Sequence, residues 1–237
     1  LHLPDIDGWR VLQALKDDPD SRHIPVHIIS VEEEQQRGLR LGAIAYLKKP
    51  ASKEAVEQAL DHVKSFVERS VKKLLVVEDN EAQRKSIAEL IGNHDVQTVA
   101  VATGKDALAA LGTQAFDGVV LDLGLPDMTG FELIERIKKD LGKMDLPIIV
   151  YTGKDLSKKE ESELRRVSEA IVVKGVRSPE RLLDETALFL HRVEANLPEP
   201  KRRVIEQIHK TDDTLAGRKL LIVDDDVRNI FALTSVL

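Results

Sequence analysis

The sequence predicts an α/β protein in which parallel strands alternate with helices. Short runs of Val, Ile and Leu recur between segments of helical periodicity over residues 72–195. These runs are nearly continuous in apolar residues, which is typical of strands buried on both faces of a parallel sheet. The stretch from Val119 to Gly130 shows the whole pattern, because an apolar run ends at Asp122 and a loop containing Pro126 then leads into a helix. We therefore expect a doubly wound parallel sheet covered by helices.

Five strands and five helices are expected in the segment 72–195. The strands are expected at 73–77, 96–101, 118–121, 147–151 and 170–173. The helices are expected at 81–91, 105–111, 131–139, 157–167 and 179–193, the last with Pro179 in its first turn, where the fixed φ of proline is favourable. Because a helix separates each strand from the next, the connections are crossovers and the strands run parallel.

The same pattern recurs elsewhere in the chain, which indicates tandem copies. Residues 3–8 resemble 125–130, and residues 24–30 resemble 146–152 at the same spacing. The spacing then grows by three residues, so the helix after Ser30 should be about one turn shorter than its counterpart. We predict the C-terminal half of a first unit at 1–70, a complete unit at 72–195, a linker with a helical portion at 196–217, and the start of a third unit at 218–237.

Both ends of the sequence indicate a piece of a longer protein. The chain begins with Leu1 rather than Met, and residues 220–225 repeat residues 74–79 shortly before the chain ends at Leu237. Half a unit has lost three of its five strands and is too small to bury a core alone. We therefore expect residues 1–70 to be ordered only where they pack on another part of the molecule.

Composition excludes several classes of protein. Aromatic residues make up 3% of the chain, which argues against a platform for stacking nucleic-acid bases, and the net charge of -6 argues against binding to a phosphate backbone. The absence of cysteine excludes disulfides and thiolate metal sites and fits a reducing compartment. No apolar run approaches the length of a membrane span, and no signal-peptide pattern is present. We expect a soluble cytoplasmic protein without a nucleic-acid partner or direct membrane contact.

Polar side chains follow four of the expected strands. They are Glu78 and Asp79 after the first strand, Asp122 after the third, Thr152 after the fourth and Lys174 after the fifth. Ligands of such sheets bind outside the carboxyl ends of the strands, where these side chains would meet. Three neighbouring carboxylates repel one another unless a cation is bound, and Mg²⁺ is a hard cation that prefers oxygen ligands. The sequence therefore predicts a magnesium site at this edge of the sheet.

The same residues predict phosphoryl transfer. A bound cation would screen Asp122 from the negative charge of an incoming phosphoryl group, while Lys174 and the Thr152 hydroxyl could hold the transferred oxygens. The covalent product would be an aspartyl phosphate on Asp122.

In order and spacing, these residues resemble the receiver domain of two-component response regulators. The matching motifs are the acidic pair Glu78-Asp79, LDLGLPDMTG, VYTGK and IVVKG. The resemblance implies a flavodoxin-like (βα)5 fold with strand order 2-1-3-4-5, present here in tandem copies. It implies that a phosphohistidine donates its phosphoryl group to Asp122. It also implies that Asp79, Asp122 and the Gly124 carbonyl bind Mg²⁺ directly, with Glu78 acting through water.

Tandem receivers resemble the C-terminal part of a bacterial hybrid sensor histidine kinase. The equivalent site positions in the partial copies are Ser30, Lys49, Asp224 and Asp225. The resemblance implies a histidine kinase or a histidine phosphotransfer domain as partner, together with neighbouring receivers of the same chain. A homodimer is left open. The expected location is cytoplasmic, with membrane anchoring of the parent kinase as an alternative.

The complete unit departs from the family pattern at two positions. Gly175 follows Lys174 where the family and the first copy have proline, and Ile171 stands where they have an aromatic residue, Tyr46 in the first copy. The family reads out phosphorylation through that aromatic side chain, and the loop after Lys174 is expected to be either trans at its peptide bond or mobile.

Two functions therefore stay open for the complete unit. One is a phosphorelay receiver that slowly hydrolyses its aspartyl phosphate, and the other is a non-switching receiver that serves as a docking or spacer module. Whether the piece is itself an enzyme is left open, although its parent is expected to be a histidine kinase. A haloacid-dehalogenase-like phosphatase needs a second Asp two residues after Asp122, where this chain has Gly124.

Overall fold

The computed structural model describes residues 6–213, except for the side chains of His62 and of residues 210–213. The chain divides into two compact units, residues 1–196 and residues 197–237. The predicted start of a third receiver at 218–237, including Asp224 and Asp225, lies outside the described residues.

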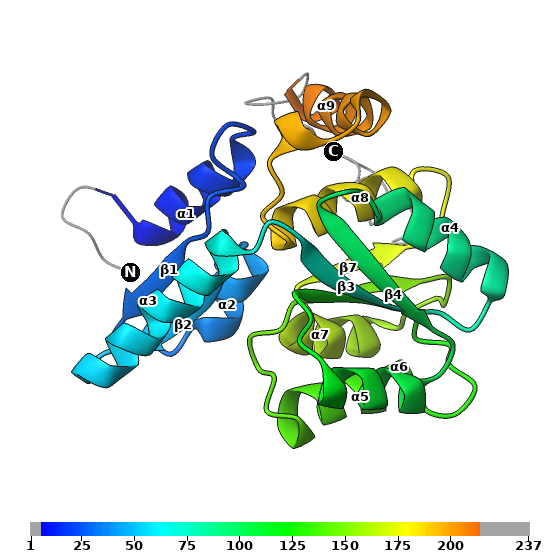
Figure 1. Cartoon of the computed structure of the whole chain (residues 1–237), viewed down its shortest axis with the longest axis horizontal. Coiled ribbons are helices and arrows are strands. Elements are labelled where there is room, and N and C mark those ends of the chain that lie inside the picture. Colours follow the sequence, from blue (N-terminus) through cyan, green and yellow to red (C-terminus); the bar gives the residue numbers. More distant parts are fainter. Residues whose placement is uncertain (1–5, 214–237) are drawn as a thin grey trace. The chain divides into compact units, whose positions relative to one another are not determined.

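A five-stranded parallel sheet forms the centre of the segment 72–195 (Figure 1). Its strands are β3 (Lys72–Val77), β4 (Val96–Val101), β5 (Gly118–Leu121), β6 (Ile148–Thr152) and β7 (Ala170–Val173). They lie side by side in the order β4-β3-β5-β6-β7, and each neighbouring pair is parallel. Counted within this segment, the order is 2-1-3-4-5, which is the flavodoxin-like arrangement. The predicted parallel sheet and its strand order are confirmed.

Helices cover both faces of this sheet (Figure 1). One face carries α4 (Glu81–Ile91) and α8 (Ser178–Phe189), and the other carries α5 (Gly104–Thr113), α6 (Gly130–Glu135) and α7 (Lys158–Val167). Side chains alternate along β3, so that Leu74 and Val76 enter the core beneath α4 and α8, whereas Leu75 and Val77 enter the other core. Burial on both faces explains why the strand has no polar alternation.

Side-chain caps fix where these helices begin. Asn80 accepts a hydrogen bond from the backbone N–H of Gln83 at the start of α4, and Thr103 caps α5 in the same way. At the start of α6, Thr129 and Glu132 form a capping box, in which each side chain bonds to the backbone of the other residue. Because these caps satisfy the free N–H groups of the first turn, each helix starts directly after a loop at the carboxyl edge of the sheet.

The helix predicted at 131–139 changes form partway along. After α6 it continues as a π-helix, η1 (Arg136–Asp140), in which the N–H of Leu141 bonds to the Arg136 carbonyl. Lys138 within η1 is 4% exposed, and its ammonium donates to the carbonyls of Met144 and Leu146. Periodicity of apolar residues predicted the helix but could not distinguish a single wide turn within it.

The last helix of the sheet domain is shorter than predicted. It was expected to reach residue 193, but α8 ends at Phe189 and His191 has a positive φ of 50°. A residue with a left-handed backbone conformation cannot continue a right-handed α-helix. The apolar periodicity continues past this point because Leu190 is still buried in the core.

The segment 6–70 holds two strands and three helices. They are α1 (Gly8–Asp17), β1 (His27–Ser30), α2 (Gln35–Arg40), β2 (Ala45–Lys48) and α3 (Lys53–Glu68). The strands β1 and β2 pair in parallel, and Trp9, Leu12, Ile28 and Ala43 form a small core beside them. The helix α2 has 6 residues where α7 has 10, which confirms the predicted loss of about one turn.

This segment packs against the sheet domain within the first unit. The guanidinium of Arg22 is 4% exposed and contacts the carboxylates of Asp184 at 2.6 Å and Glu194 at 3.1 Å. The Phe66 ring meets His191 edge to face at 5.4 Å between ring centroids. The described part of the segment therefore packs on another part of the first unit.

The second unit contains α9 (Glu199–Asp213), which falls within the predicted linker, and a short 3-10 helix, η2 (Glu194–Asn196), precedes it at the end of the first unit. Across residues 6–213, no helix has both the length and the apolar character needed to cross a membrane.

Candidate functional site

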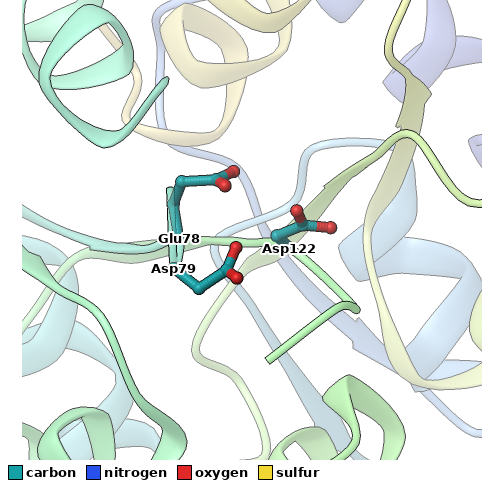
Figure 2. A group of neighbouring side chains, drawn as sticks. All are labelled: Glu78, Asp79 and Asp122. Carbon is teal, nitrogen blue, oxygen red and sulfur yellow. The ribbon is translucent and has the colours of Figure 1, made fainter. Parts of the chain in front are cut away.

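Three carboxylates gather at the carboxyl edge of the sheet (Figure 2). Glu78 and Asp79 follow β3, and Asp122 follows β5. The two strands are direct neighbours, and the N–H of Asp122 donates to the Val77 carbonyl at 2.9 Å. One oxygen from each carboxylate lies within 4.8 Å of the others. The predicted acidic cluster is therefore brought together by strand pairing.

Lys174 reaches this cluster from the edge strand β7. Its ammonium donates to Glu78 Oε2 at 2.8 Å and to Asp122 Oδ2 at 2.7 Å. Burial of the ammonium lowers the pKa of Lys174, but the hydrogen bonds to Asp122 and Glu78 outweigh it and raise the pKa above its ordinary value. The side chain therefore stays a cation that links two of the acids.

The two acids that contact Lys174 differ in their pKa. Glu78 is 1% exposed, and this burial raises its pKa despite the opposing effect of Lys174. Burial also opposes ionisation of Asp122, but hydrogen bonds from Lys174 and Thr152 lower the pKa of Asp122 below its usual value. Asp122 is thus held as the carboxylate, which is the form that can act as a nucleophile.

Thr152 and Gly124 complete the surroundings of Asp122. Thr152 ends β6, is 1% exposed, and accepts a hydrogen bond from the N–H of Lys154 at 3.1 Å. The N–H of Gly124 lies 3.4 Å from Asp122 Oδ1, and a Cβ placed on Gly124 would meet nothing within 4 Å. The loop after Asp122 therefore leaves open space on one side of Gly124.

The donor set fits the predicted magnesium ion. Three carboxylates supply hard oxygen donors at distances short enough to share one small cation. Asp79 is exposed and Asp122 is half-buried, so a hydrated ion could approach from solvent. The role of the Gly124 carbonyl as a ligand stays a prediction.

Two residues that sequence reasoning did not assign to the site shape its loops. The carboxylate of Asp127 accepts hydrogen bonds from the backbone N–H groups of Gly104 and Lys105, both at 2.9 Å. It ties the loop after Asp122 to the first turn of α5. Arg84 donates to the carbonyl of Glu78 at 2.8 Å. The recurrence of Leu-Pro-Asp in both copies was the available signal for Asp127.

A similar backbone contact occurs in the segment 6–70. The N–H of Lys49 donates to the Ser30 carbonyl at 2.7 Å, and the N–H of Lys174 donates to the Thr152 carbonyl at 2.8 Å. Ser30 and Lys49 therefore have the same backbone relation as Thr152 and Lys174.

The two departures from the family pattern have distinct surroundings. Ile171 packs against the core beneath α5, α6 and α7, whereas the hydroxyl of Tyr46 donates to the Glu32 carbonyl at 2.6 Å. Among the described residues, Lys49–Pro50 is the only cis peptide bond, so the bond from Lys174 to Gly175 is trans.

Comparison with known proteins agrees with this geometry. Residues 74–186 match the family model of the response regulator receiver domain. The chain is 26% identical over 104 residues to the two-component response regulator ORR5 of Oryza sativa subsp. japonica, which covers 44% of this chain and 78% of that protein. It is 30% identical over 120 residues to the sensor histidine kinase RcsC of Salmonella typhi, covering 51% of this chain and 12% of that kinase.

Among solved structures, the chemotaxis response regulator CheY4 of Vibrio cholerae is 26% identical and superposes with a TM-score of 0.46. The superposition covers 50% of this chain and 98% of that one.

Proposed function

We propose, from the premise that residues 74–186 form one response regulator receiver domain, that this domain accepts a phosphoryl group on Asp122. The observation that carries the proposal is the pair of short contacts from Lys174 to Asp122 and Glu78, beside the exposed carboxylate of Asp79. An ionised nucleophile, a cation and an oxygen-rich cluster then stand together where a phosphoryl group can enter.

Asp122 performs the transfer as a nucleophile. One of its carboxylate oxygens attacks the phosphorus of a phosphohistidine, an O–P bond forms, and the N–P bond breaks with its electron pair passing to the imidazole nitrogen. Lys174 is positioned to compensate the charge of the transferred oxygens, and the Thr152 hydroxyl can donate to one of them. Water later attacks the phosphorus, which restores the Asp122 carboxylate and releases inorganic phosphate.

Glu78, Asp79 and Asp122 would hold Mg²⁺, with the Gly124 carbonyl as a further ligand. When bound, Mg²⁺ supplies positive charge that offsets the repulsion between the carboxylates and the phosphoryl oxygens. Lys174 supplies part of that compensation from the protein itself.

The partners of such a receiver are a histidine kinase or a histidine phosphotransfer domain. We place the receiver in a hybrid kinase with a cytoplasmic location, in tandem with a first receiver at 1–70 and a third at 218–237. The parallel strands β1 and β2, with Ser30 and Lys49 in the same backbone relation as Thr152 and Lys174, support the first of these copies. The similarity to part of the sensor kinase RcsC supports the parent context.

The second candidate function is a receiver that docks neighbouring domains without switching. It is favoured by Ile171, which occupies the core position where the first copy has Tyr46. Without an aromatic side chain at this position, Thr152 lacks the usual partner that would carry a change at Asp122 to the surface.

The decisive experiment is the intact mass of the full chain after incubation with acetyl phosphate and Mg²⁺. We expect one phosphoryl group per chain, absent from Asp122→Asn and strongly reduced when Mg²⁺ is chelated. Asp106→Asn, which changes an exposed acid outside the cluster, serves as the matched control and should be labelled like the parent. If the parent takes up no phosphoryl group and binds no Mg²⁺, the docking function is the better account.

A further inference from the structure

The backbone after Lys174 is held by the buried hydroxyl of Ser178 and by one backbone hydrogen bond, in which the Ser178 N–H donates to the Gly175 carbonyl at 3.2 Å. Ser178 is 4% exposed, and its Oγ accepts a hydrogen bond from the N–H of Gly175 at 2.9 Å. The same Oγ lies 2.8 Å from the Gly175 carbonyl and 3.0 Å from the hydroxyl of Tyr151. Three contacts to one atom from two sides close the loop between β7 and α8.

These three contacts saturate the Ser178 hydroxyl. A serine hydroxyl can donate one hydrogen bond and accept two. Ser178 accepts from the Gly175 N–H, donates to the Gly175 carbonyl, and has one lone pair left to accept the proton of Tyr151. Tyr151 is 8% exposed and belongs to β6, so the loop is tied directly to the interior of the sheet.

Little else constrains the loop at this point. Val176 is 98% exposed, and a Cβ placed on Gly175 would meet nothing within 4 Å. Arg177, at the N-cap of α8, makes no side-chain capping bond. Side-chain packing therefore does little to hold the loop, which depends on the hydroxyl of Ser178 and on the backbone bond from Ser178 to Gly175.

The first copy has its serine one position earlier, at Ser52, which corresponds to Arg177 rather than to Ser178. Ser52 lies three residues after Lys49, and its hydroxyl caps α3 by accepting from the N–H of Ala55 at 3.2 Å. Pro50 follows Lys49 and has no N–H to donate. In the complete copy, Gly175 supplies an N–H at the same place, and Ser178 turns back to accept it.

We propose that Ser178 and Tyr151 are positioning residues, which fix the Lys174–Gly175 backbone so that the Lys174 ammonium reaches Asp122 and Glu78. Lysine has a long flexible side chain, so its reach to a target depends on where its backbone is held. Lys174 is anchored on one side by its N–H to the Thr152 carbonyl and on the other by this hydroxyl. The expected effect on phosphoryl transfer rests on the proposed phosphoacceptor function. The positioning of Lys174 by Ser178 and Tyr151 does not.

The test compares four variants of the full chain. Ser178→Ala removes all three contacts, Tyr151→Phe removes one, and Ser178→Thr keeps a hydroxyl at the same carbon. Gly175→Pro removes the donated N–H. Ser162→Ala, on the exposed side of α7, is the matched control. Thermal melting establishes that each variant is folded.

The first readout is the NMR signal of the Lys174 side-chain ammonium, which the hydrogen bonds to Glu78 and Asp122 protect from exchange with water. We expect Ser178→Ala and Gly175→Pro to broaden this signal, Tyr151→Phe to have a smaller effect, and Ser178→Thr to restore it. This readout needs no phosphorylation, so it decides the geometry even if the chain accepts no phosphoryl group.

The second readout is the rate of phosphoryl uptake from acetyl phosphate as Mg²⁺ is varied. We expect Ser178→Ala to lower the rate at saturating Mg²⁺ by roughly fivefold to tenfold, as the loss of a hydrogen bond predicts. The Mg²⁺ concentration for half the maximal rate should fall, because a displaced Lys174 ammonium leaves more negative charge on the acids of the cluster. A Lys174 signal and a saturated rate that are the same in all folded variants would overturn the proposal.

Discussion

At the scale of single residues, the site is organised by the competition for two carboxylates. Lys174 contacts both Glu78 and Asp122 at 2.8 and 2.7 Å, and the same acids belong to the cluster that fits a divalent cation. An ammonium and a metal ion that share ligands oppose each other's binding, because each lowers the negative charge that attracts the other.

Removing the Lys174 ammonium should therefore strengthen Mg²⁺ binding and weaken phosphoryl transfer. We expect Lys174→Met to bind Mg²⁺ roughly tenfold more tightly, since the acids lose a neighbouring positive charge. Its phosphoryl uptake should fall, because the charge of the transferred oxygens is less well compensated. Isothermal titration with Mg²⁺ and the uptake assay measure the two effects. The matched control is Lys154→Met, which removes an exposed ammonium that pairs with Glu160. Weaker Mg²⁺ binding in Lys174→Met would contradict this account.

His191 predicts a pH dependence of stability. Burial, followed by the charges of Lys16, Lys72 and His23, lowers the pKa of His191 to about 3. Its ring nitrogen Nδ1 lies 3.4 Å from the Lys16 ammonium. The unfolded chain then binds a proton at this residue below about pH 6.5 while the folded chain does not. The free energy of unfolding therefore falls as the pH decreases from about 6.5 towards 3.

The variant His191→Asn isolates this contribution, because asparagine tolerates the φ of 50° and does not titrate. Between pH 7.5 and 5.0, the parent should lose about 2 kcal/mol of unfolding free energy relative to the variant. Urea unfolding at both pH values gives the difference. Other titrating groups, such as Glu185 with its pKa raised to about 7, are common to both chains and cancel. Parallel pH profiles would contradict the prediction.

At the scale of elements, the π-helix η1 places a charge inside the fold. Lys138 lies in η1, and its ammonium contacts Glu169 at 3.3 Å, with side chains 4% and 2% exposed. Glu169 in turn accepts from the N–H of Ile148 at 2.5 Å, which joins η1 to the start of β6 and β7. Burial raises the pKa of Glu169, and Lys138 opposes this.

Removing this ammonium should destabilise the sheet domain. Lys138→Met leaves Glu169 buried without its cation and two carbonyls without their donor, so we expect a loss of about 3 kcal/mol or more in the free energy of unfolding. Lys139→Met, on the exposed side of the same turn, should change it little. Adding Glu169→Gln to Lys138→Met should recover part of the loss. Chemical unfolding measures all three, and equal effects of the two lysine variants would disprove the role of the buried pair.

At the scale of the first unit, the buried Arg22 is one of the residues that join the segment 6–70 to the sheet domain. Arg22 contacts Asp184 on α8 and Glu194 at the start of η2. Lys16 supports the same loop, because its ammonium donates to the Arg22 carbonyl at 3.0 Å. Breaking a buried ion pair from one side leaves its acids uncompensated, so this contact should control how firmly the segment is held.

Arg22→Ala should loosen the segment without loosening the sheet. We expect faster amide hydrogen exchange in α1, β1 and β2, with unchanged protection in β3, β5 and β6. Arg10→Ala removes an exposed arginine from α1 and serves as the control. Exchange measured by mass spectrometry on the full chain separates the outcomes. A uniform increase over both parts would mean that they unfold together.

The sequence alone determined the sheet, its strands and the identity of the acids. An apolar run has to be buried, so β5 occurs where it was predicted and all four of its residues are buried. The edge strands β4 and β7 are only partly buried, but they also occur where they were predicted. The strand order was predicted from the resemblance of the motifs to receiver domains. This order places the strands that carry Asp122, Glu78 and Asp79 next to each other.

Only the tertiary structure decided the features that depend on contacts between distant parts. The π-turn at Lys138, the early end of α8 before His191, and the bonds of Ser178 to Gly175 and Tyr151 leave no periodic pattern. Hydrophobic periodicity shows which face of an element is buried, because a buried face needs an apolar residue at each turn of a helix or at every second residue of a strand. A single hydrogen bond acts once and leaves no repeated pattern in the sequence, so it becomes visible only when the chain is folded.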